Sequence, residues 1–100
     1  MAAKINWSVK ADGNFEKIIN YLLKNWSERE VVNFVNKVDT ALTSISENPN
    51  LYKASRLKPD LHKFVLAKQV SIIYKYSPTT NKILLVTFWD NRMNRKKLKF

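Results

Sequence analysis

The sequence contains no cysteine, one glycine and one histidine among 100 residues. Without cysteine, a disulfide framework, a thiolate metal site and a cysteine nucleophile are all excluded. A single glycine excludes a glycine-rich phosphate-binding loop, and a single histidine excludes zinc sites built on His and Cys. Because proline is also scarce, collagen-like, linker-like and disordered classes are excluded as well.

Long apolar runs are missing too. The longest, Ile83–Trp89, is far shorter than the roughly 18 residues that a membrane-spanning helix needs. Residues 1–14 contain no apolar segment of the kind found in secretory signals. A chain of 100 residues with 45% apolar residues is long enough for one domain with a real core. We therefore expect residues 1–100 to form a single domain in the cytoplasm, with no membrane partner.

Negative charge is scarce, with 8 acidic residues against 18 basic ones and a net charge of +10. Residues 1–47 hold six of each sign, whereas residues 48–100 hold twelve basic residues and only two acidic ones, Asp60 and Asp90. The whole excess therefore lies in the second half. Such a field attracts polyanions, either nucleic acid or an acidic protein. The alternative is that these residues only keep a small protein soluble.

The first half predicts a short strand followed by a helix. Ile5–Val9 alternates apolar and polar residues, as a strand does. Ser8 is a candidate N-cap for a helix that begins between residues 9 and 14. Apolar residues then recur with helical spacing on one stripe, at Phe15, Ile18, Ile19, Leu22, Leu23 and Trp26.

A second helix follows at once. Ser27 and Glu30 have the spacing of a capping box, and Pro49 ends the apolar pattern that begins at Val31 because proline cannot continue a helix. Since almost no chain separates the two helices, they must form an αα-hairpin.

The remaining chain predicts strands at Leu61–Leu66, Val70–Tyr76 and Lys82–Trp89. Turn residues at 77–81 join the last two strands in an antiparallel hairpin. Ile83–Trp89 is apolar at both alternating sets of positions, which predicts a central strand covered on both faces or nearly so. The helices must bury their stripes against an antiparallel sheet, so the fold class is α+β.

Catalysis through a metal is not expected, because six of the eight acidic residues lie on the two helices at spacings typical of solvated faces. We expect no metal and no other cofactor. Metal-free cleavage of RNA needs only a proton-transfer pair and cations around the phosphate. If the protein is such a metal-free ribonuclease, the catalytic candidates are His62, Lys68 and Arg92. The alternative for His62 is a structural role in its strand, and the three tryptophans Trp7, Trp26 and Trp89 are interpreted as core residues.

Five segments in this order together resemble the RelE/ParE toxin superfamily of plasmid-stabilisation proteins. They are Asn6-Trp7-Ser8, the helix Phe15–Leu22, the helix end Ser46-Glu47-Asn48-Pro49, the strand region Phe64–Tyr76 and the closing Val86–Asn94 with its Asp-x-Arg motif. The resemblance implies an N-terminal strand, an αα-hairpin and three or more antiparallel strands, with the helices on one face of the sheet. It also implies a toxin of a type II toxin–antitoxin pair, neutralised by an acidic cognate antitoxin.

The superfamily contains both metal-independent, ribosome-dependent mRNA endonucleases of the RelE kind and gyrase inhibitors of the ParE kind. Ser71 stands where the resemblance places an arginine of the endonucleases, and serine cannot replace the paired contacts of a guanidinium with phosphate. The form Asp90-x-Arg92 is more similar to the ParE side, although Arg95 replaces a common proline. We therefore expect a ParE-like toxin that binds DNA gyrase; the alternatives are an mRNA endonuclease and a non-toxic nucleic-acid-binding module.

Basic residues of the second half are the candidates for binding target, nucleic acid or antitoxin, and the alternative for those near the C-terminus is a solvated tail. They are Lys53, Arg56, Lys63, Lys68, Arg92, Arg95, Lys96 and Lys97.

Overall fold

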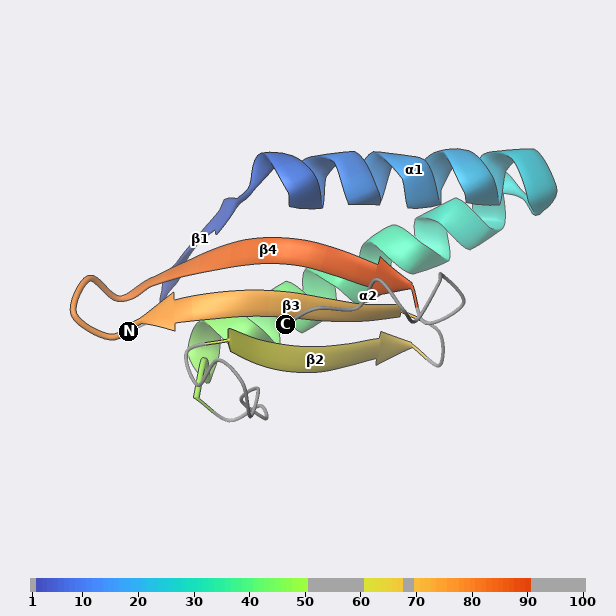
Figure 1. The fold of residues 1–100 in the computed structure, drawn as a ribbon. Coiled ribbons are helices and arrows are strands. Elements are labelled where there is room, and N and C mark those ends of the chain that lie inside the picture. Colours follow the sequence, from blue (N-terminus) through green and yellow to red (C-terminus); the bar gives the residue numbers. More distant parts are fainter. Residues whose placement is uncertain (1, 51–60, 68–69, 91–100) are drawn as a thin grey trace.

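The computed structural model describes residues 2–50, 61–67 and 70–90, which form two helices and a four-stranded sheet (Figure 1). The elements are β1 (Lys4–Trp7), α1 (Val9–Asn25), α2 (Glu28–Glu47), β2 (Leu61–Ala67), β3 (Val70–Ser77) and β4 (Lys82–Asp90). The strand order is β1-β4-β3-β2, and the helices cover one face. The fold class is the predicted α+β arrangement. No helix in this part of the chain is long and apolar enough to cross a membrane.

The N-terminal strand is shorter than the sequence predicts. β1 ends at Trp7 rather than Val9, because Ser8 already caps α1. The Ser8 hydroxyl accepts a hydrogen bond from the Ala11 amide at 2.9 Å and donates one to the carbonyl of Val86 at 2.8 Å. The predicted cap is therefore confirmed, and Val9 belongs to the helix.

The second helix has the predicted boundaries. The Ser27 side chain accepts a hydrogen bond from the Glu30 amide at 3.4 Å, and α2 ends at Glu47, just before Asn48 and Pro49. α1 and α2 form the predicted αα-hairpin, visible at the right of Figure 1.

The strand β4 occupies the predicted central position. It pairs antiparallel with β3 and parallel with β1. Val86 forms a bulge, because Leu85 lies opposite Tyr74 and Thr87 lies opposite Ile73. The extra residue lets Leu85 and Phe88, three positions apart, both join the core under the helices.

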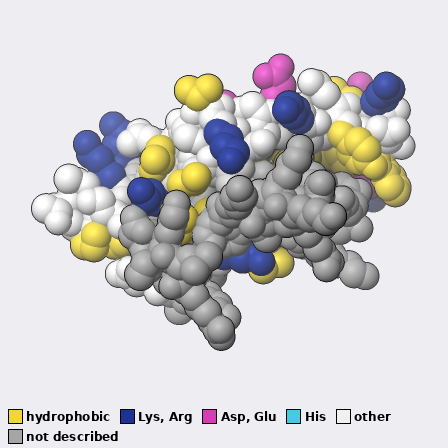
Figure 2. Space-filling model, in the orientation of Figure 1, with side chains coloured by type: hydrophobic (Ala, Val, Ile, Leu, Met, Phe, Trp, Pro, Cys, Tyr) yellow, Lys and Arg dark blue, Asp and Glu magenta, His cyan; other side chains and the backbone are white. Residues whose placement is uncertain are grey.

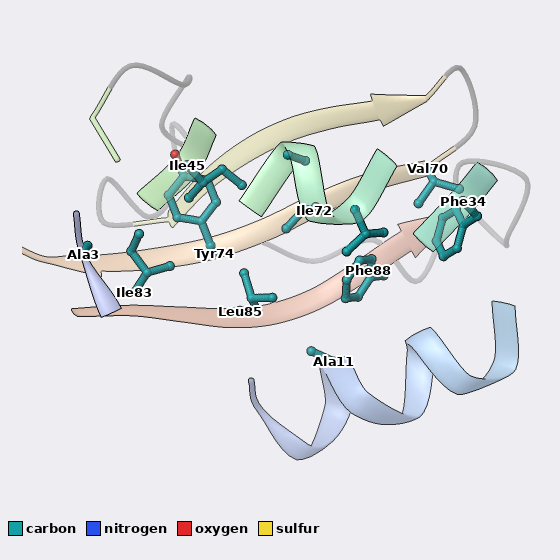
Figure 3. Close-up of a cluster of buried hydrophobic side chains, with 12 residues drawn as sticks. Ala3, Ala11, Phe34, Ile45, Val70, Ile72, Tyr74, Ile83, Leu85 and Phe88 are labelled. Atoms are coloured by element: carbon teal, nitrogen blue, oxygen red, sulfur yellow. The ribbon is translucent and has the colours of Figure 1, made fainter. Parts of the chain in front are cut away.

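The core lies between the helices and the sheet. Figure 3 shows Ile45 of α2 beside Tyr74 of β3, and both side chains are fully buried. The Tyr74 hydroxyl donates a hydrogen bond to the Pro49 carbonyl at 2.8 Å. Trp7 packs edge-on against Phe15, with ring centroids 5.3 Å apart, so its predicted core role is confirmed.

The far end of the helical hairpin departs from the prediction. Trp26 is 64% exposed and Leu23 is 50% exposed, so the interpretation of Trp26 as a core residue is wrong. Trp26 is the C-cap residue of α1, and this end of the hairpin extends past the sheet (Figure 1). An apolar stripe continues there without a sheet beneath it.

Candidate functional site

The sheet face that turns away from the helices carries a lysine on every strand. In β1, Ile5 and Trp7 pack against the core, so Lys4 and Asn6 point to the opposite face because side chains alternate along a strand. The same alternation places three further lysines there, each next to a residue that packs in the core: Lys63 beside Phe64, Lys75 beside Tyr74, and Lys82 beside Ile83.

The strand register arranges these lysines diagonally across the sheet. Lys4 lies directly opposite Lys82 in the parallel pair β1–β4. In the next pair, Lys75 lies opposite Leu84, two residues from Lys82, and Lys63 lies opposite Ile73, two residues from Lys75. Diagonal neighbours of this kind are about 7–8 Å apart. We call Lys4, Lys82, Lys75 and Lys63 the lysine stripe.

The stripe lies in a layer almost free of acidic residues. Among the described strands the only acidic residue is Asp90, at the end of β4, whereas α1 and α2 carry six. Figure 2 shows basic side chains both where β1 and the β3–β4 hairpin lie and along the helical hairpin, whereas the acidic ones in this view lie along the helical hairpin. The described ranges also hold no group of three or more His, Cys, Asp or Glu residues that could bind a metal ion.

An open hollow of about 420 Å³ lies at the hairpin end of the stripe. Lys75 and Lys82 line it together with Asn6, Leu84 and Pro78. Leu84 is 41% exposed, so the predicted cover on both faces of β4 is incomplete here. The lining of the hollow is therefore mixed, with Leu84 and Pro78 among lysines and other polar residues.

His62 and Lys63, the two site candidates within the described residues, point to opposite faces of β2. The His62 ring stacks on Tyr74 with centroids 5.1 Å apart, on the helix side, and is 9% exposed. Lys63 belongs to the open face. The structure therefore does not bring these two side chains together. The other candidates lie outside the described residues: Lys53, Arg56, Lys68, Arg92, Arg95, Lys96 and Lys97.

Ser71 lies in β3 on the sheet face that turns away from the helices, between Val65 of β2 and Trp89 of β4. It is completely buried, and its hydroxyl has no hydrogen-bond partner in the structure as described. The position that the family resemblance gives to a phosphate-binding arginine is therefore both uncharged and inaccessible.

Sequence reasoning missed three members of the stripe: Lys4, Lys75 and Lys82. Lys4 belongs to the half of the chain with balanced charge, and its position beside Lys82 depends on a parallel pairing across 78 residues. For Lys75 and Lys82 the alternation of the predicted strands was the available signal, whereas Lys4 precedes the predicted strand Ile5–Val9.

A protein-family model described as "ParE toxin of type II toxin-antitoxin system, parDE" matches residues 5–95. The chain is a member of the ParE toxin family. No curated protein sequence matches it significantly.

Solved structures share the fold of this ParE-family chain at low sequence identity. The toxin fold in the chromosomal ParDE system of Pseudomonas aeruginosa superposes with a TM-score of 0.70 and 13% identity, covering 89% of this chain and 96% of the other. The RelBE2 toxin–antitoxin complex of Mycobacterium tuberculosis superposes with a TM-score of 0.63 and 11% identity, covering 90% of this chain and 99% of the other. The YoeB dimer of Staphylococcus aureus superposes with a TM-score of 0.60 and 18% identity, covering 89% of this chain and 97% of the other. At such identities the likeness carries the fold alone, and the family membership rests on the sequence match.

Proposed function

We propose that this toxin acts by binding and inhibiting a target such as DNA gyrase, without cleaving RNA. Ser71 carries the proposal. Cleavage of RNA needs cations that stabilise the charge developing at the phosphate, and a buried serine supplies none at the place where the resemblance puts an arginine.

The position of His62 supports the same proposal. A general base must reach the proton that it removes, within hydrogen-bond distance or through one water. The His62 ring lies against Tyr74 on the helix side of the sheet, whereas Lys63 is on the open face. A substrate held by that face would therefore not meet the imidazole.

We further propose that an acidic antitoxin neutralises the toxin in the cytoplasm. The net charge of +10 and the nearly acid-free sheet layer favour an acidic partner, since complementary fields speed association and exclude wrong partners. The ParDE and RelBE2 structures of similar fold are themselves toxin–antitoxin systems.

Two assays on the purified protein test the proposed target. In a DNA supercoiling assay with gyrase, we expect inhibition at micromolar toxin. In cell-free translation, we expect primer extension to show intact mRNA. Unchanged supercoiling would contradict gyrase as the target. Discrete cuts that appear only with ribosomes would instead establish the endonuclease, with Lys68, Arg92 and His62 as the residues to substitute next. Salt-sensitive nucleic-acid binding without either effect would support a plain binding module.

A further inference from the structure

We propose that the exposed end of the helical hairpin is a surface through which two copies of this chain pair weakly. We call residues 21–32, which include the end of α1 and the start of α2, the hairpin tip. The pairing involves neither gyrase nor an antitoxin, so the inference goes beyond the proposed function and does not depend on it.

The first support is the number of apolar side chains exposed at the hairpin tip. The described residues expose seven large hydrophobic side chains, and four of them belong to the tip: Tyr21, Leu23, Trp26 and Val32. Figure 2 shows hydrophobic side chains gathered at this end of the molecule. Leu23 and Trp26 continue the apolar stripe of α1 past the edge of the sheet (Figure 1). Exposed apolar groups that cluster among charged ones are typical of an interaction surface.

The second support is the charge of the hairpin tip, which suits a second copy of the same chain. The tip carries two basic and two acidic residues, all exposed: Lys24, Arg29, Glu28 and Glu30. Its net charge is therefore zero, whereas the whole chain carries +10. Two copies that met at their strand layers would bring like charges together and repel each other. At the hairpin tip this local repulsion is absent.

The third support is that the tip can face itself. In a two-fold pair both copies use the same patch, so a residue i that contacts j is matched by j contacting i. A patch that holds both signs satisfies this condition, because Lys24 of one copy can lie near Glu28 of the other while the reverse contact forms as well. The tip extends past the sheet (Figure 1), so the tips can meet while the basic strand layers stay apart.

The size of the patch determines how strong the pairing is. A whole aromatic side chain buries about 150–250 Å², and Trp26 and Leu23 are 64% and 50% exposed. Two copies of these side chains therefore remove roughly 500 Å² from water. Interfaces below about 1,200 Å² belong to weak and transient complexes. We therefore expect a dissociation constant on the order of 100 μM, with monomers at low concentration.

The test measures self-association of the full chain by sedimentation velocity, at concentrations from about tenfold below to about fivefold above the expected dissociation constant. Trp26→Ser removes the largest apolar group of the tip. Val9→Ser is the matched control, because Val9 is 90% exposed at the opposite end of α1. Circular dichroism establishes that each variant is folded.

We expect the sedimentation coefficient of the unaltered chain and of Val9→Ser to rise with concentration. Trp26→Ser should pair about tenfold more weakly, as for the loss of a central aromatic contact. A monomeric unaltered chain at every concentration would overturn the inference. Equal association of the two variants would overturn the assignment to the tip. Weaker inhibition of supercoiling by Trp26→Ser, without any change in its sedimentation, would also overturn it and would assign the tip to the target instead.

A second experiment tests the two-fold arrangement through charge. Glu28→Lys with Glu30→Lys makes the tip positive, and Lys24→Glu with Arg29→Glu makes it negative. Each double variant alone should stay monomeric, because like charges then face each other. An equimolar mixture of the two should pair at least about tenfold more tightly than either variant alone. A mixture that stays monomeric would overturn the inference. These measurements contain no gyrase or ribosome, so their failure is distinct from a failure of the supercoiling assay.

Discussion

Three residues on the sheet face that turns away from the helices occupy positions that lower the stability of the fold. Lys4 and Lys82 lie opposite each other, and Ser71 is buried with a hydroxyl that has no partner among the described groups. Each feature costs stability on general grounds, through charge repulsion or through desolvation of a polar group. Both lie on the sheet face that turns away from the helices, Lys4 and Lys82 at its exposed end and Ser71 where that face is buried.

The opposed lysines lead to a stability prediction. Lys4→Gln should raise the free energy of unfolding by about 0.3–0.5 kcal/mol at low salt, because it removes a like-charge pair. The gain should shrink at high salt as the repulsion is screened. Urea unfolding measures both, with Lys10→Gln on α1 as the matched control. A loss of stability in Lys4→Gln would contradict the repulsion.

The buried hydroxyl leads to a second prediction. Ser71→Ala should leave stability unchanged or raise it by up to about 1 kcal/mol, because it removes an unsatisfied polar group. Ser46 is the matched control, since its hydroxyl donates a hydrogen bond to the Ala3 carbonyl at 2.6 Å. Ser46→Ala should cost about 1 kcal/mol. Urea unfolding of both variants is the measurement, and a larger loss at Ser71 than at Ser46 would contradict the assignment.

At the scale of elements, the N-cap residue of α1, Ser8, links this helix to the sheet. Ser8 both caps the helix and donates a hydrogen bond to the carbonyl of Val86, the bulge residue of β4. One hydroxyl therefore satisfies a helix amide and a carbonyl at the irregularity that brings Phe88 into the core.

This double role predicts unequal costs for two helix caps. Ser8→Ala should lower the free energy of unfolding by about 2 kcal/mol, since it removes a cap and a tertiary hydrogen bond. Ser27→Ala should cost about 0.5 kcal/mol, because its bond to Glu30 is exposed and long, at 3.4 Å. Thermal or urea unfolding gives both values. Similar costs at the two positions would show that the contact with Val86 contributes little.

The elements were the most predictable part of the fold. Local signals defined both helices: the serine caps, the apolar period and Pro49. Such signals contain nothing about where a sheet ends, so the period ran on to Trp26, which the structure leaves exposed. The same limit applies to Ile5–Val9, where the alternation of a strand and the cap of a helix overlap at Ser8 and only the tertiary contacts decide the boundary.

At the scale of the whole molecule, charge divides between layers as well as between halves of the sequence. The sequence predicted a basic second half, and Lys63, Lys75 and Lys82 of the stripe belong to it. Lys4 joins them only because β1 returns to pair with β4, a contact that local patterns do not contain. For the same reason the opposite orientations of His62 and Lys63 followed from register and not from composition.

The position of β1 at the edge of the sheet predicts that its removal promotes association between chains. Deleting residues 2–7 would leave β4 as an edge strand, with the unpaired backbone groups that promote association between chains. We expect this variant to associate more strongly than the full chain at equal concentration, as measured by size-exclusion chromatography with light scattering. The full chain carrying Lys4→Gln is the control. A folded, monomeric deletion variant would contradict a role for β1 in protecting this edge.

The pairing of β1 with β4 also sets a minimum time between the synthesis of β1 and the completion of the sheet. The two strands meet across 78 residues, so the ribosome must add all of them after β1 before the sheet can close. At about 5–20 residues per second this takes about 4–16 s. Throughout that interval Lys4 has no Lys82 opposite it, because β4 is not yet present. The complete four-stranded sheet, with Lys4 beside Lys82, can therefore form only after β4 has been synthesised.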